Sequence, residues 1–307
     1  MKIKRREFLG AAAVAGATVA GSGVSAVAAG AKDADALNPV AMVPFGKNLK
    51  VTRIGFGTGM RAWRRTSNQI KLGKEHFENL FRYCYDKGIR LFDTADLYGS
   101  HGYAARSLKG KPRDSYSLVS KIWWRKDGVP DEDKGDADVV VKRFLKELQT
   151  DYIDVVHLHC MTDPKWPENH RKQMDLLEDL KQKGLIRAHG VSCHSLGAME
   201  AAAKEPWVDA VNIRVNPFHT KTDGKAEKIL PVIKNIHAAG KGVIGMKIIG
   251  EGQFTGDSQK IDDSVKFAVD SGAVDCMIVG FEQTAQIDDF IGRVKKALAK
   301  KAKKKTV

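Results

Sequence analysis

The sequence has few cysteines and no internal repeat. Its four cysteines are widely spaced and form no Cys-x-x-Cys pair, so the sequence encodes neither a disulfide framework nor a structural zinc site. Low-complexity segments are confined to the two ends of the chain. Only 7% of the 307 residues are aromatic, yet 43% are hydrophobic, which excludes a disordered or fibrous chain and predicts a globular protein with a large core.

The central part of the chain also lacks a strong charge of either sign. The formal net charge is +14, but residues 1–30 contribute +3 and the residues after Asp289 contribute +8. The remaining body carries only +3, which argues against a nucleic-acid partner bound along a phosphate-tracking groove. The Lys-rich tail, residues 293–307, is expected to be a solvated helix end whose cations suit the negative pole of the helix dipole, with weak surface adhesion as the alternative.

Residues 1–29 have the features of an export signal. Residues 4–10 (KRREFLG) resemble the twin-arginine motif of bacterial signal peptides, and a weakly apolar run of residues 11–29 follows them. That run is long enough to span a bilayer, but its alanines and glycines make it a poor transmembrane helix. We expect the twin-arginine export machinery to deliver the folded protein to the periplasm, with cleavage after Ala28 and no stable membrane insertion afterwards. An anchor that is never cleaved is the alternative.

Eight short apolar segments, rich in β-branched residues and bounded by Gly, Asp or Asn, predict eight strands. These segments are residues 51–57, 90–93, 116–122, 152–159, 187–192, 210–215, 242–248 and 275–280. Helical patterns with apolar residues three and four apart separate them, which predicts parallel strands covered by helices. Eight such units predict an α/β fold, a single (β/α)8 TIM barrel over residues 50–292, preceded by an N-terminal extension at residues 30–49.

A doubly wound open sheet is the competing fold. No Gly-x-Gly-x-x-Gly motif follows the first predicted strand, where a dinucleotide-binding open sheet brings its backbone close to a pyrophosphate. The barrel is therefore preferred.

Two irregular stretches are candidates for the walls of a pocket. Residues 61–74 and 124–135 follow the carboxyl ends of the first and third predicted strands, and barrel enzymes bind substrates at that face. The side chains of Trp63, Trp123 and Trp124 line an aromatic or apolar substrate pocket there or pack at the barrel rim.

Three consecutive predicted strands end in polar side chains that barrel packing would not select. Asp93 ends the second strand, Lys121 the third and His159 the fourth. Each of them alone is most simply a satisfied polar residue at a strand end. Together they bring a carboxylate, an amine and an imidazole to one rim of the barrel, which indicates a catalytic site.

The residues around these strand ends resemble the aldo-keto reductase family. The spacing from Asp93 to Tyr98, the position of Lys121 after a serine, and His159 five residues beyond Asp154 are similar to the four catalytic positions of the family. The resemblance implies that these four residues are catalytic.

Two further segments carry the same resemblance. Residues 184–192 (GLIRAHGVS) are similar to the fifth-strand segment of the family, and residues 55–59 (GFGTG) are similar to its opening strand. The motifs occur in order and with the right separations, so the resemblance extends over about residues 50–292. It implies an NAD(P)H-dependent reductase that converts a small aldehyde or ketone to an alcohol, with NADP or NAD as cofactor.

The chemistry of carbonyl reduction calls for these residue types. Transfer of a hydride to a carbonyl places negative charge on its oxygen, so the site needs a proton donor and positive potential beside that oxygen. Tyr98 is a hydroxyl donor with an ordinary pKa of about 10, and a nearby Lys121 cation is expected to lower that pKa. Asp93 would hold the Lys121 ammonium, and His159 would orient the carbonyl by donating a hydrogen bond. A nicotinamide supplies the hydride, and no metal is required.

The cofactor-binding positions follow the family less closely. Ser192 matches the serine that binds the nicotinamide carboxamide, but Cys193 stands where asparagine is usual and Asn212 where glutamine is common. Met246 stands where many members stack a tyrosine on the nicotinamide, and a thioether can cover a ring face by dispersion. Lys247 beside it is a candidate for facing the pyrophosphate.

At the adenine end, the resemblance points to Gly280, Phe281 and Gln286 as the residues around a 2′-phosphate. None of them is charged, whereas a bound 2′-phosphate is held by cations or by several oriented donors. We therefore expect weak discrimination between NADP and NAD. His101, which replaces a glutamate after the Tyr-Gly pair of the family, is a further difference.

A metal-dependent barrel hydrolase is the main alternative enzyme. His157 and His159 form a His-x-His pair on one strand, so their imidazoles point the same way, as metal ligands on barrel strands do. Such hydrolases resemble each other in placing this pair on the first strand, with further histidines on the fifth and sixth strands, whereas His194 and His219 lie slightly past those strand ends. His157 is more simply an internal barrel residue.

Two further hypotheses remain, a Schiff-base aldolase and a redox sensor, and neither involves a metal or carbonyl reduction. A Schiff-base aldolase built on Lys121 would leave Asp93 and Tyr98 without a role. A slow nicotinamide-binding redox sensor, or a partner-binding barrel, is the non-enzyme hypothesis. The export signal motivates it, because the periplasm has no obvious pool of reduced nicotinamide.

Overall fold

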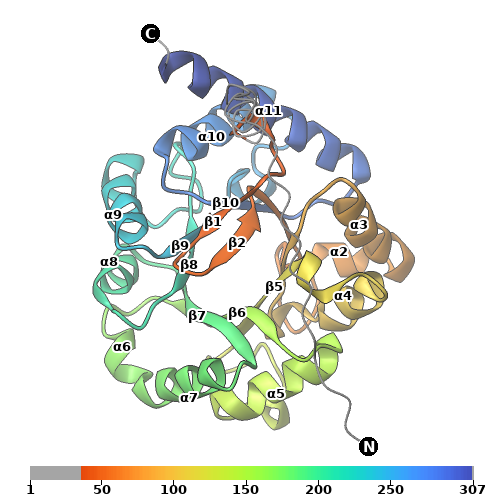
Figure 1. The fold of residues 1–307 in the computed structure, drawn as a ribbon, viewed down its shortest axis with the longest axis vertical. Coiled ribbons are helices and arrows are strands. Elements are labelled where there is room, and N and C mark those ends of the chain that lie inside the picture. Colours follow the sequence, from red (N-terminus) through yellow and green to blue (C-terminus); the bar gives the residue numbers. More distant parts are fainter. Residues whose placement is uncertain (1–35, 306–307) are drawn as a thin grey trace, which may run out of the picture. The chain divides into compact units, whose positions relative to one another are not determined.

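Eight parallel strands close into a barrel in the computed structural model, which describes residues 36–305 (Figure 1). The strands are β3 (Ile54–Gly57), β4 (Leu91–Asp93), β5 (Ser117–Ile122), β6 (Ile153–Met161), β7 (Ile186–Cys193), β8 (Ala210–Arg214), β9 (Gly242–Met246) and β10 (Cys276–Val279). They are arranged in chain order, and β10 pairs with β3 to complete the ring. This pairing excludes the open doubly wound sheet and confirms the predicted (β/α)8 barrel.

Helices follow the barrel strands and surround them (Figure 1). The α-helices are α2 (Asn68–Lys71), α3 (Lys74–Asp86), α4 (His101–Leu108), α5 (Ala137–Leu148), α6 (Trp166–Asn169), α7 (Arg171–Gln182), α8 (Leu196–Lys204), α9 (Ala226–Ala238), α10 (Ser258–Ser271) and α11 (Thr284–Lys305). Short 3-10 helices lie in the connections: η1 (Asp96–Tyr98), η2 (Arg113–Ser115), η3 (Asp131–Asp133) and η4 (Gly250–Gly252). None of the helices in residues 36–305 is long and apolar enough to cross a membrane. The predicted export signal at residues 1–29 lies outside the described residues.

The helices form because their apolar residues recur every three or four positions. In α5 the buried side chains are those of Ala137, Val140, Val141, Phe144 and Leu148. This spacing gives the helix one apolar stripe, which faces the strands. The helix ends at Gln149, whose backbone is in the left-handed region at a φ of 52°.

An antiparallel hairpin precedes the barrel, which the sequence pattern did not predict. The segment 51–57, predicted as one strand, is divided between β2 (Leu49–Thr52) and β3, and β2 pairs with β1 (Met42–Phe45). The chain leaves β2 at Thr52, whose hydroxyl donates to Ile54 O at 2.7 Å and accepts from the backbone N–H of Arg90 at 3.0 Å. The bond with Arg90 joins segments that are distant in the sequence, so the local pattern of residues 51–57 could not reveal the break.

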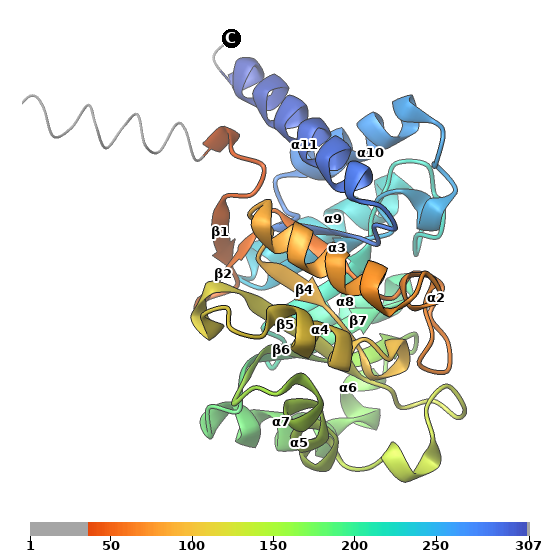
Figure 2. The same ribbon diagram turned by 90° about the vertical axis from the view of Figure 1, so that its right-hand side faces the viewer.

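The hairpin closes the amino-terminal end of the barrel. Phe45 is 1% exposed and packs on Gly242 at the start of β9, where an added Cβ would lie 2.5 Å from the phenylalanine ring. Figure 2 shows the hairpin at one end of the barrel and α2, which follows β3, at the opposite end. The carboxyl ends of the strands therefore remain open for a site.

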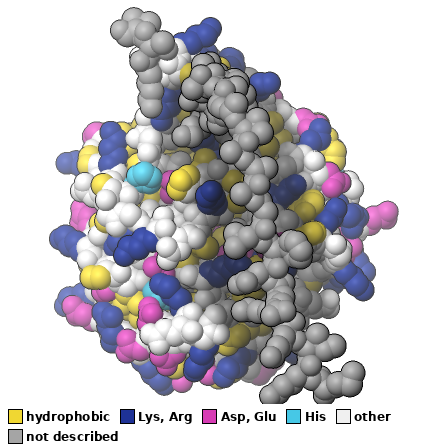
Figure 3. Space-filling model, viewed as in Figure 1, with side chains coloured by type: hydrophobic (Ala, Val, Ile, Leu, Met, Phe, Trp, Pro, Cys, Tyr) yellow, Lys and Arg dark blue, Asp and Glu magenta, His cyan; other side chains and the backbone are white. Residues whose placement is uncertain are grey.

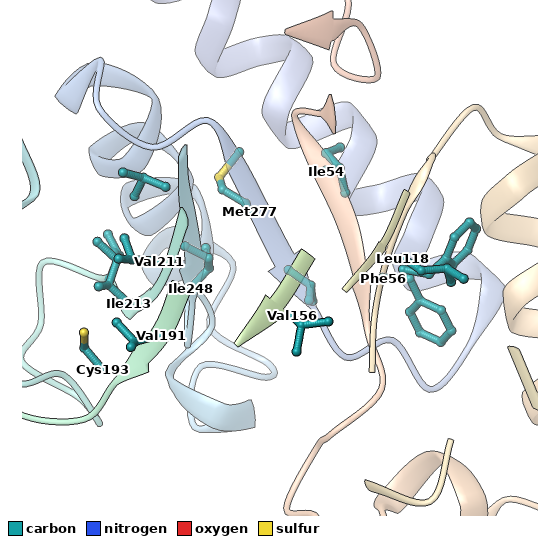
Figure 4. Packing of buried hydrophobic residues seen from close by; sticks show 14 of the residues in the cluster. Ile54, Phe56, Leu118, Val156, Val191, Cys193, Val211, Ile213, Ile248 and Met277 are labelled. Carbon is teal, nitrogen blue, oxygen red and sulfur yellow. The ribbon is translucent and has the colours of Figure 1, made fainter. Parts of the chain in front are cut away.

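Side chains alternate between two cores along each strand. Inside the barrel, Leu91, Val119 and Val155 pack with the hairpin. On the outer face, Phe56, Leu118, Val156, Val191, Val211, Ile213 and Met277 pack under the helices, as Figure 4 shows. Because side chains alternate with a period of two, the inward positions that follow toward the carboxyl ends are Asp93, Lys121, His157 and His159.

The Lys-rich residues 293–305 form the last part of a helix. Helix α11 runs from Thr284 to Lys305, with Val294, Ala297 and Leu298 buried and the lysines toward its end largely exposed. Among the described residues in the view of Figure 3, Lys and Arg side chains are interspersed with Asp and Glu, which agrees with the nearly balanced charge of the body.

Candidate active site

Asp93 and Lys121 form a buried ion pair at the carboxyl end of the barrel. Lys121 Nζ lies 2.6 Å from Asp93 Oδ1 and donates a second hydrogen bond to Thr94 O at 2.9 Å. Asn212 Nδ2 donates to the same Asp93 oxygen at 3.1 Å. The two charged side chains are 2% and 1% exposed, respectively. With both charges satisfied by partners, this arrangement fixes the Lys121 ammonium at one point in the barrel.

Burial and pairing act in opposite directions on these two groups. Burial raises the pKa of the Asp93 carboxyl, and the Lys121 charge and the hydrogen bonds from Lys121 and Asn212 lower it. Burial likewise lowers the pKa of the Lys121 ammonium, and the Asp93 carboxylate raises it. Each charge therefore depends on the other for its stability in the barrel.

Tyr98 ends the short helix η1, and its ring packs closely against Gly59 and lies under Lys121. A Cβ added to Gly59 would lie 2.4 Å from the ring, so only glycine fits at that position. Lys121 Nζ lies over the ring at 4.8 Å from its centroid. The backbone turns at Gly99, at a φ of 70°, where an added Cβ would lie 2.2 Å from Arg65 O. Two glycines therefore determine the position of the phenol.

The pKa of the Tyr98 hydroxyl is raised well above its ordinary value. Burial is the main cause, although the residue stays partly exposed through the cleft, and the Asp93 carboxylate raises the pKa further. The expectation that Lys121 lowers the pKa of Tyr98 is therefore wrong, since Asp93 lies 2.6 Å from the ammonium and offsets its charge. The phenol is protonated at neutral pH and can donate its proton.

His159 lies against Tyr98 near the end of β6. The two rings are in an edge-to-face arrangement with centroids 5.6 Å apart, and the Trp123 ring also meets the imidazole edge-to-face at 5.2 Å. Burial and the nearby Lys121 lower the pKa of His159 well below its ordinary value. His159 is therefore neutral, and its Nδ1 has no hydrogen-bond partner among residues 36–305. The imidazole can donate one hydrogen bond to a bound molecule.

The other histidines do not gather around His159 as the hydrolase hypothesis requires. His157 pairs in register with Lys121, is fully buried, and has no partner for either ring nitrogen among the described residues. His194 lies 6.4 Å from His159 between ring centroids, whereas His219 is in a loop, where its Nδ1 contacts Thr222 Oγ1 at 3.1 Å. Within residues 36–305, no group of three or more His, Cys, Asp or Glu side chains is placed to hold a metal ion.

The three tryptophans near the barrel rim have different environments. Trp63 is 46% exposed and meets Trp123 edge-to-face at 5.9 Å, and Trp123 in turn contacts His159. Trp124 instead packs beside His170 at 5.8 Å. Trp63 and Trp123 therefore form an aromatic wall beside the site, and Trp124 belongs to the packing behind it.

A cleft runs from Tyr98 toward the start of α11. Its inner part, of about 80 Å³, is lined by residues that include Asp93, Tyr98, Met246, Lys247 and Gly280. Its outer part, of about 350 Å³, includes Gly280, Phe281, Gln286 and Arg293 in its lining. Met60, Ile249, Val279 and Gly280 line both parts. The predicted cofactor positions Met246, Lys247, Gly280 and Gln286 thus face one continuous cleft.

Ser192 and Asn212 lie beneath the cleft rather than in its lining. Ser192 Oγ accepts a hydrogen bond from the Cys160 backbone N–H at 2.7 Å. Asn212 uses its amide nitrogen on Asp93, while its Oδ1 is buried without a partner among the described residues. Lys247 Nζ is paired with Glu251 at 2.5 Å. Asn212 therefore contacts the Asp93 carboxylate directly, which the sequence did not indicate.

The outer part of the cleft contains a cation that is already neutralised. Arg293 is hydrogen-bonded to Asp289 at 2.7 Å and to Asp262 at 2.6 Å. Gln286 Oε1 accepts the backbone N–H groups of Glu282 and Gln283. Glu282 and Asp289 also line this part of the cleft. The uncharged positions predicted at the adenine end are thus accompanied by two carboxylates and one paired guanidinium.

Several residues near the site were missed by sequence reasoning. Gly59 packs directly against the Tyr98 ring. Its position in the glycine-rich segment 55–59 was the one sequence feature that could have indicated such a close contact. His101, noted only as a difference from the family, is buried between Glu147 Oε2 at 2.6 Å and Ser120 Oγ at 2.8 Å. These contacts explain why an imidazole is stable at that position.

The chain is similar to known proteins in both sequence and fold. The profile of the Aldo/keto reductase family matches residues 53–267. Aldo-keto reductase YhdN of Bacillus subtilis is 28% identical over 233 residues, which are 70% of this chain and 66% of that protein. Methylglyoxal reductase DkgB of Salmonella typhimurium is 29% identical over 141 residues, which are 43% of this chain and 49% of that protein. The chain spans less than two thirds of the length of either relative.

Two solved structures share the barrel. A protein of Pseudomonas aeruginosa assigned as an aldo-keto reductase has a TM-score of 0.68 and 26% identity, covering 85% of this chain and 96% of its own. An aldo/keto reductase of Klebsiella pneumoniae, solved with NADP and acetate, has a TM-score of 0.60 and 21% identity, covering 84% and 89%. At 21% identity the second likeness concerns the fold alone. Asp93, Tyr98, Lys121 and His159 all fall within the residues matched by the family profile.

Proposed function

Because the chain belongs to the aldo-keto reductase family, we propose that it reduces a small aldehyde or ketone to an alcohol with a nicotinamide cofactor. The observation that carries the proposal is the convergence of four side chains at one end of the barrel. Asp93 lies 2.6 Å from Lys121, Lys121 lies 4.8 Å from the Tyr98 ring centroid, and the Tyr98 and His159 rings are 5.6 Å apart. A buried ion pair, a protonated phenol and a neutral imidazole are together a set of groups suited to carbonyl reduction.

The cleft and the polar residues beneath it fit a nicotinamide cofactor. The inner part of the cleft lies beside Tyr98, and Met246 covers one side of it with an apolar thioether. Asn212 Oδ1 is a buried acceptor without a partner among the described residues, as the amide group of a carboxamide would require. Ser192 adds a hydroxyl next to it on the neighbouring strand, since Ser192 and Asn212 are paired in register. When bound there, the nicotinamide supplies the hydride.

The chain's own residues supply position, a proton and electrostatic stabilisation. Tyr98 gives its phenolic proton to the carbonyl oxygen as negative charge develops there. Lys121, fixed by Asp93, keeps a positive charge beside the phenol while that proton leaves. His159 donates a hydrogen bond that orients the carbonyl toward the cleft. Trp63 and Trp123 limit access of water from one side.

Titration of the purified protein with NADPH and with NADH tests the cofactor part of the proposal. Trp123 lies near the cleft through His159 and Tyr98, so we expect a saturable change of protein fluorescence with either nucleotide. A panel of aldehydes should then oxidise the bound cofactor. Failure of both nucleotides to bind would count against the proposal.

We expect the dissociation constants of NADPH and NADH to differ by less than about tenfold. One charge-assisted contact to phosphate is worth roughly 1.5–3 kcal/mol, about tenfold to over a hundredfold in affinity. Gly280, Phe281 and Gln286 offer no such contact, and Arg293 is engaged by Asp262 and Asp289. Fluorescence titration of both nucleotides measures the ratio. A preference for NADPH above about a hundredfold would show that another cation replaces the missing contacts.

We also propose that the twin-arginine machinery exports the protein to the periplasm, on the basis of residues 1–29. Replacement of Arg5 and Arg6 together by lysine should retain the protein in the cytoplasm of a bacterial host with that machinery. Cell fractionation followed by detection of the chain measures its distribution. A periplasmic fraction that is equal for the natural and the substituted chain would contradict this assignment.

A further inference from the structure

Arg125 lies on the rim of the proposed site and is fixed there by the strand that carries His159. Its Nη2 donates to Cys160 O at 3.1 Å and to Thr162 Oγ1 at 3.0 Å, both just beyond His159. The guanidinium centre lies 6.0 Å from the Trp123 ring, whose other neighbours are His159 and Trp63. Arg125 is exposed, but these contacts hold it beside the catalytic imidazole.

Three buried or half-buried cations near the site have carboxylate partners, and Arg125 does not. Lys121 is paired with Asp93, Lys247 with Glu251, and Arg214 with Asp223. Among the described residues, no carboxylate lies within 4.0 Å of the Arg125 guanidinium, and its Nε and Nη1 have no hydrogen-bond partner. Arg125 therefore presents a positive charge without an ion pair, and three of its N–H donors are available.

The neighbouring titratable groups do not balance this charge. Burial, together with nearby cations that include Arg125, lowers the pKa of His194 to about 3 and that of His159 well below its ordinary value. Burial raises the pKa of the Cys160 thiol. All three side chains are neutral at pH 7. An anionic group on a bound molecule would supply the missing charge.

The structure assigns to this site a carbonyl substrate that carries an oxyanion group, a carboxylate or a phosphate, bound by Arg125. Arginine suits such groups because its planar donors bind oxygen atoms with charge-assisted hydrogen bonds. The Trp123 ring lies between the guanidinium centre and His159, and Trp63 meets it edge-to-face, so the body of the substrate lies along an aromatic surface that favours a flat or apolar framework. This inference rests on the proposed carbonyl reduction and specifies its substrate class.

Matched aldehydes test the inference. 4-Carboxybenzaldehyde and 4-formylbenzamide have nearly the same shape and differ in charge, and 4-formylphenyl phosphate extends the comparison to a phosphate. We expect kcat/KM for at least one anionic aldehyde to exceed that for the amide by about 10- to 100-fold in the natural protein. Two ratios are compared: kcat/KM of the carboxylate to that of the amide, and kcat/KM of the phosphate to that of the amide. The larger ratio identifies which anionic group Arg125 recognises. In Arg125→Gln the ratio should fall below about threefold.

Lys126→Gln is the matched control, because Lys126 is the adjacent exposed cation and forms no ion pair among the described residues. It removes the same charge from the same loop, so the ratio should stay within about twofold of the natural value. An equal loss in both variants would assign the effect to the general field and overturn the role of Arg125. Equal kcat/KM for charged and neutral aldehydes in the natural protein would overturn the substrate class alone. Reduction of none of the aldehydes would instead count against the proposed function.

Discussion

Replacing Tyr98 by phenylalanine is expected to lower kcat/KM for carbonyl reduction by at least about 100-fold, since a general acid typically contributes 10²–10⁴-fold. Phenylalanine keeps the ring that packs on Gly59 and under Lys121, and removes only the hydroxyl that donates the proton. The dissociation constant of NADPH should change by less than about threefold, because the hydroxyl is not part of the proposed carboxamide site. Steady-state kinetics and fluorescence titration measure the two effects separately.

Tyr83→Phe is a suitable control for this substitution. The Tyr83 hydroxyl donates to Asp288 at 2.6 Å on the surface between α3 and α11, and Tyr83 lines neither part of the cleft. This control should retain full activity. Retention of more than about a tenth of the activity in Tyr98→Phe would mean that another group, or water, delivers the proton.

The second large effect is expected on stability, from Asp93→Asn. The substitution leaves the Lys121 ammonium buried without its counter-charge, and breaking a buried pair from one side typically costs about 3–5 kcal/mol. Urea denaturation should therefore show a free energy of unfolding lower by about that amount. Carbonyl reduction should fall as well, because Lys121 loses the contact that fixes it at 2.6 Å.

The double variant Asp93→Asn with Lys121→Met separates the charge effect from loss of packing. Replacement of both partners of a buried ion pair is often close to neutral, so the double variant should regain at least half of the lost stability. It should remain inactive, since the positive charge beside Tyr98 is gone. A double variant as unstable as Asp93→Asn would show that the pair is not the source of the instability.

The barrel could be predicted because each of its strands and helices has a recognisable pattern within a short stretch of sequence. Each strand is a short apolar run and each helix repeats its apolar residues every three or four positions, as α5 illustrates. The polar strand ends at Asp93, Lys121 and His159 were visible for the same reason, since they interrupt apolar segments. The alternation of side chains along strands then placed all three inside the barrel.

Features that depend on contacts between distant segments could not be predicted in this way. The break between β2 and β3 depends on the hydroxyl of Thr52 accepting a hydrogen bond from Arg90, which lies 38 residues further along the chain. The raised pKa of Tyr98 arises from burial and from Asp93, and the sequence gives neither. Arg125 likewise lies in a loop with no pattern, and only its contacts with Cys160 and Thr162 show that it faces the site.

Transfer of deuterium from the cofactor to the product is the most direct test of the proposed function. The purified protein is incubated with an aldehyde and NADPH or NADH deuterated at the transferable position of the nicotinamide, and the alcohol is analysed by mass spectrometry. Carbonyl reduction in this site predicts one deuterium on the carbinol carbon, unchanged by EDTA and almost absent in Tyr98→Phe. Binding of the cofactor without formation of labelled alcohol, across the charged and neutral aldehydes, would contradict the enzyme and favour a nicotinamide-binding protein that does not turn over.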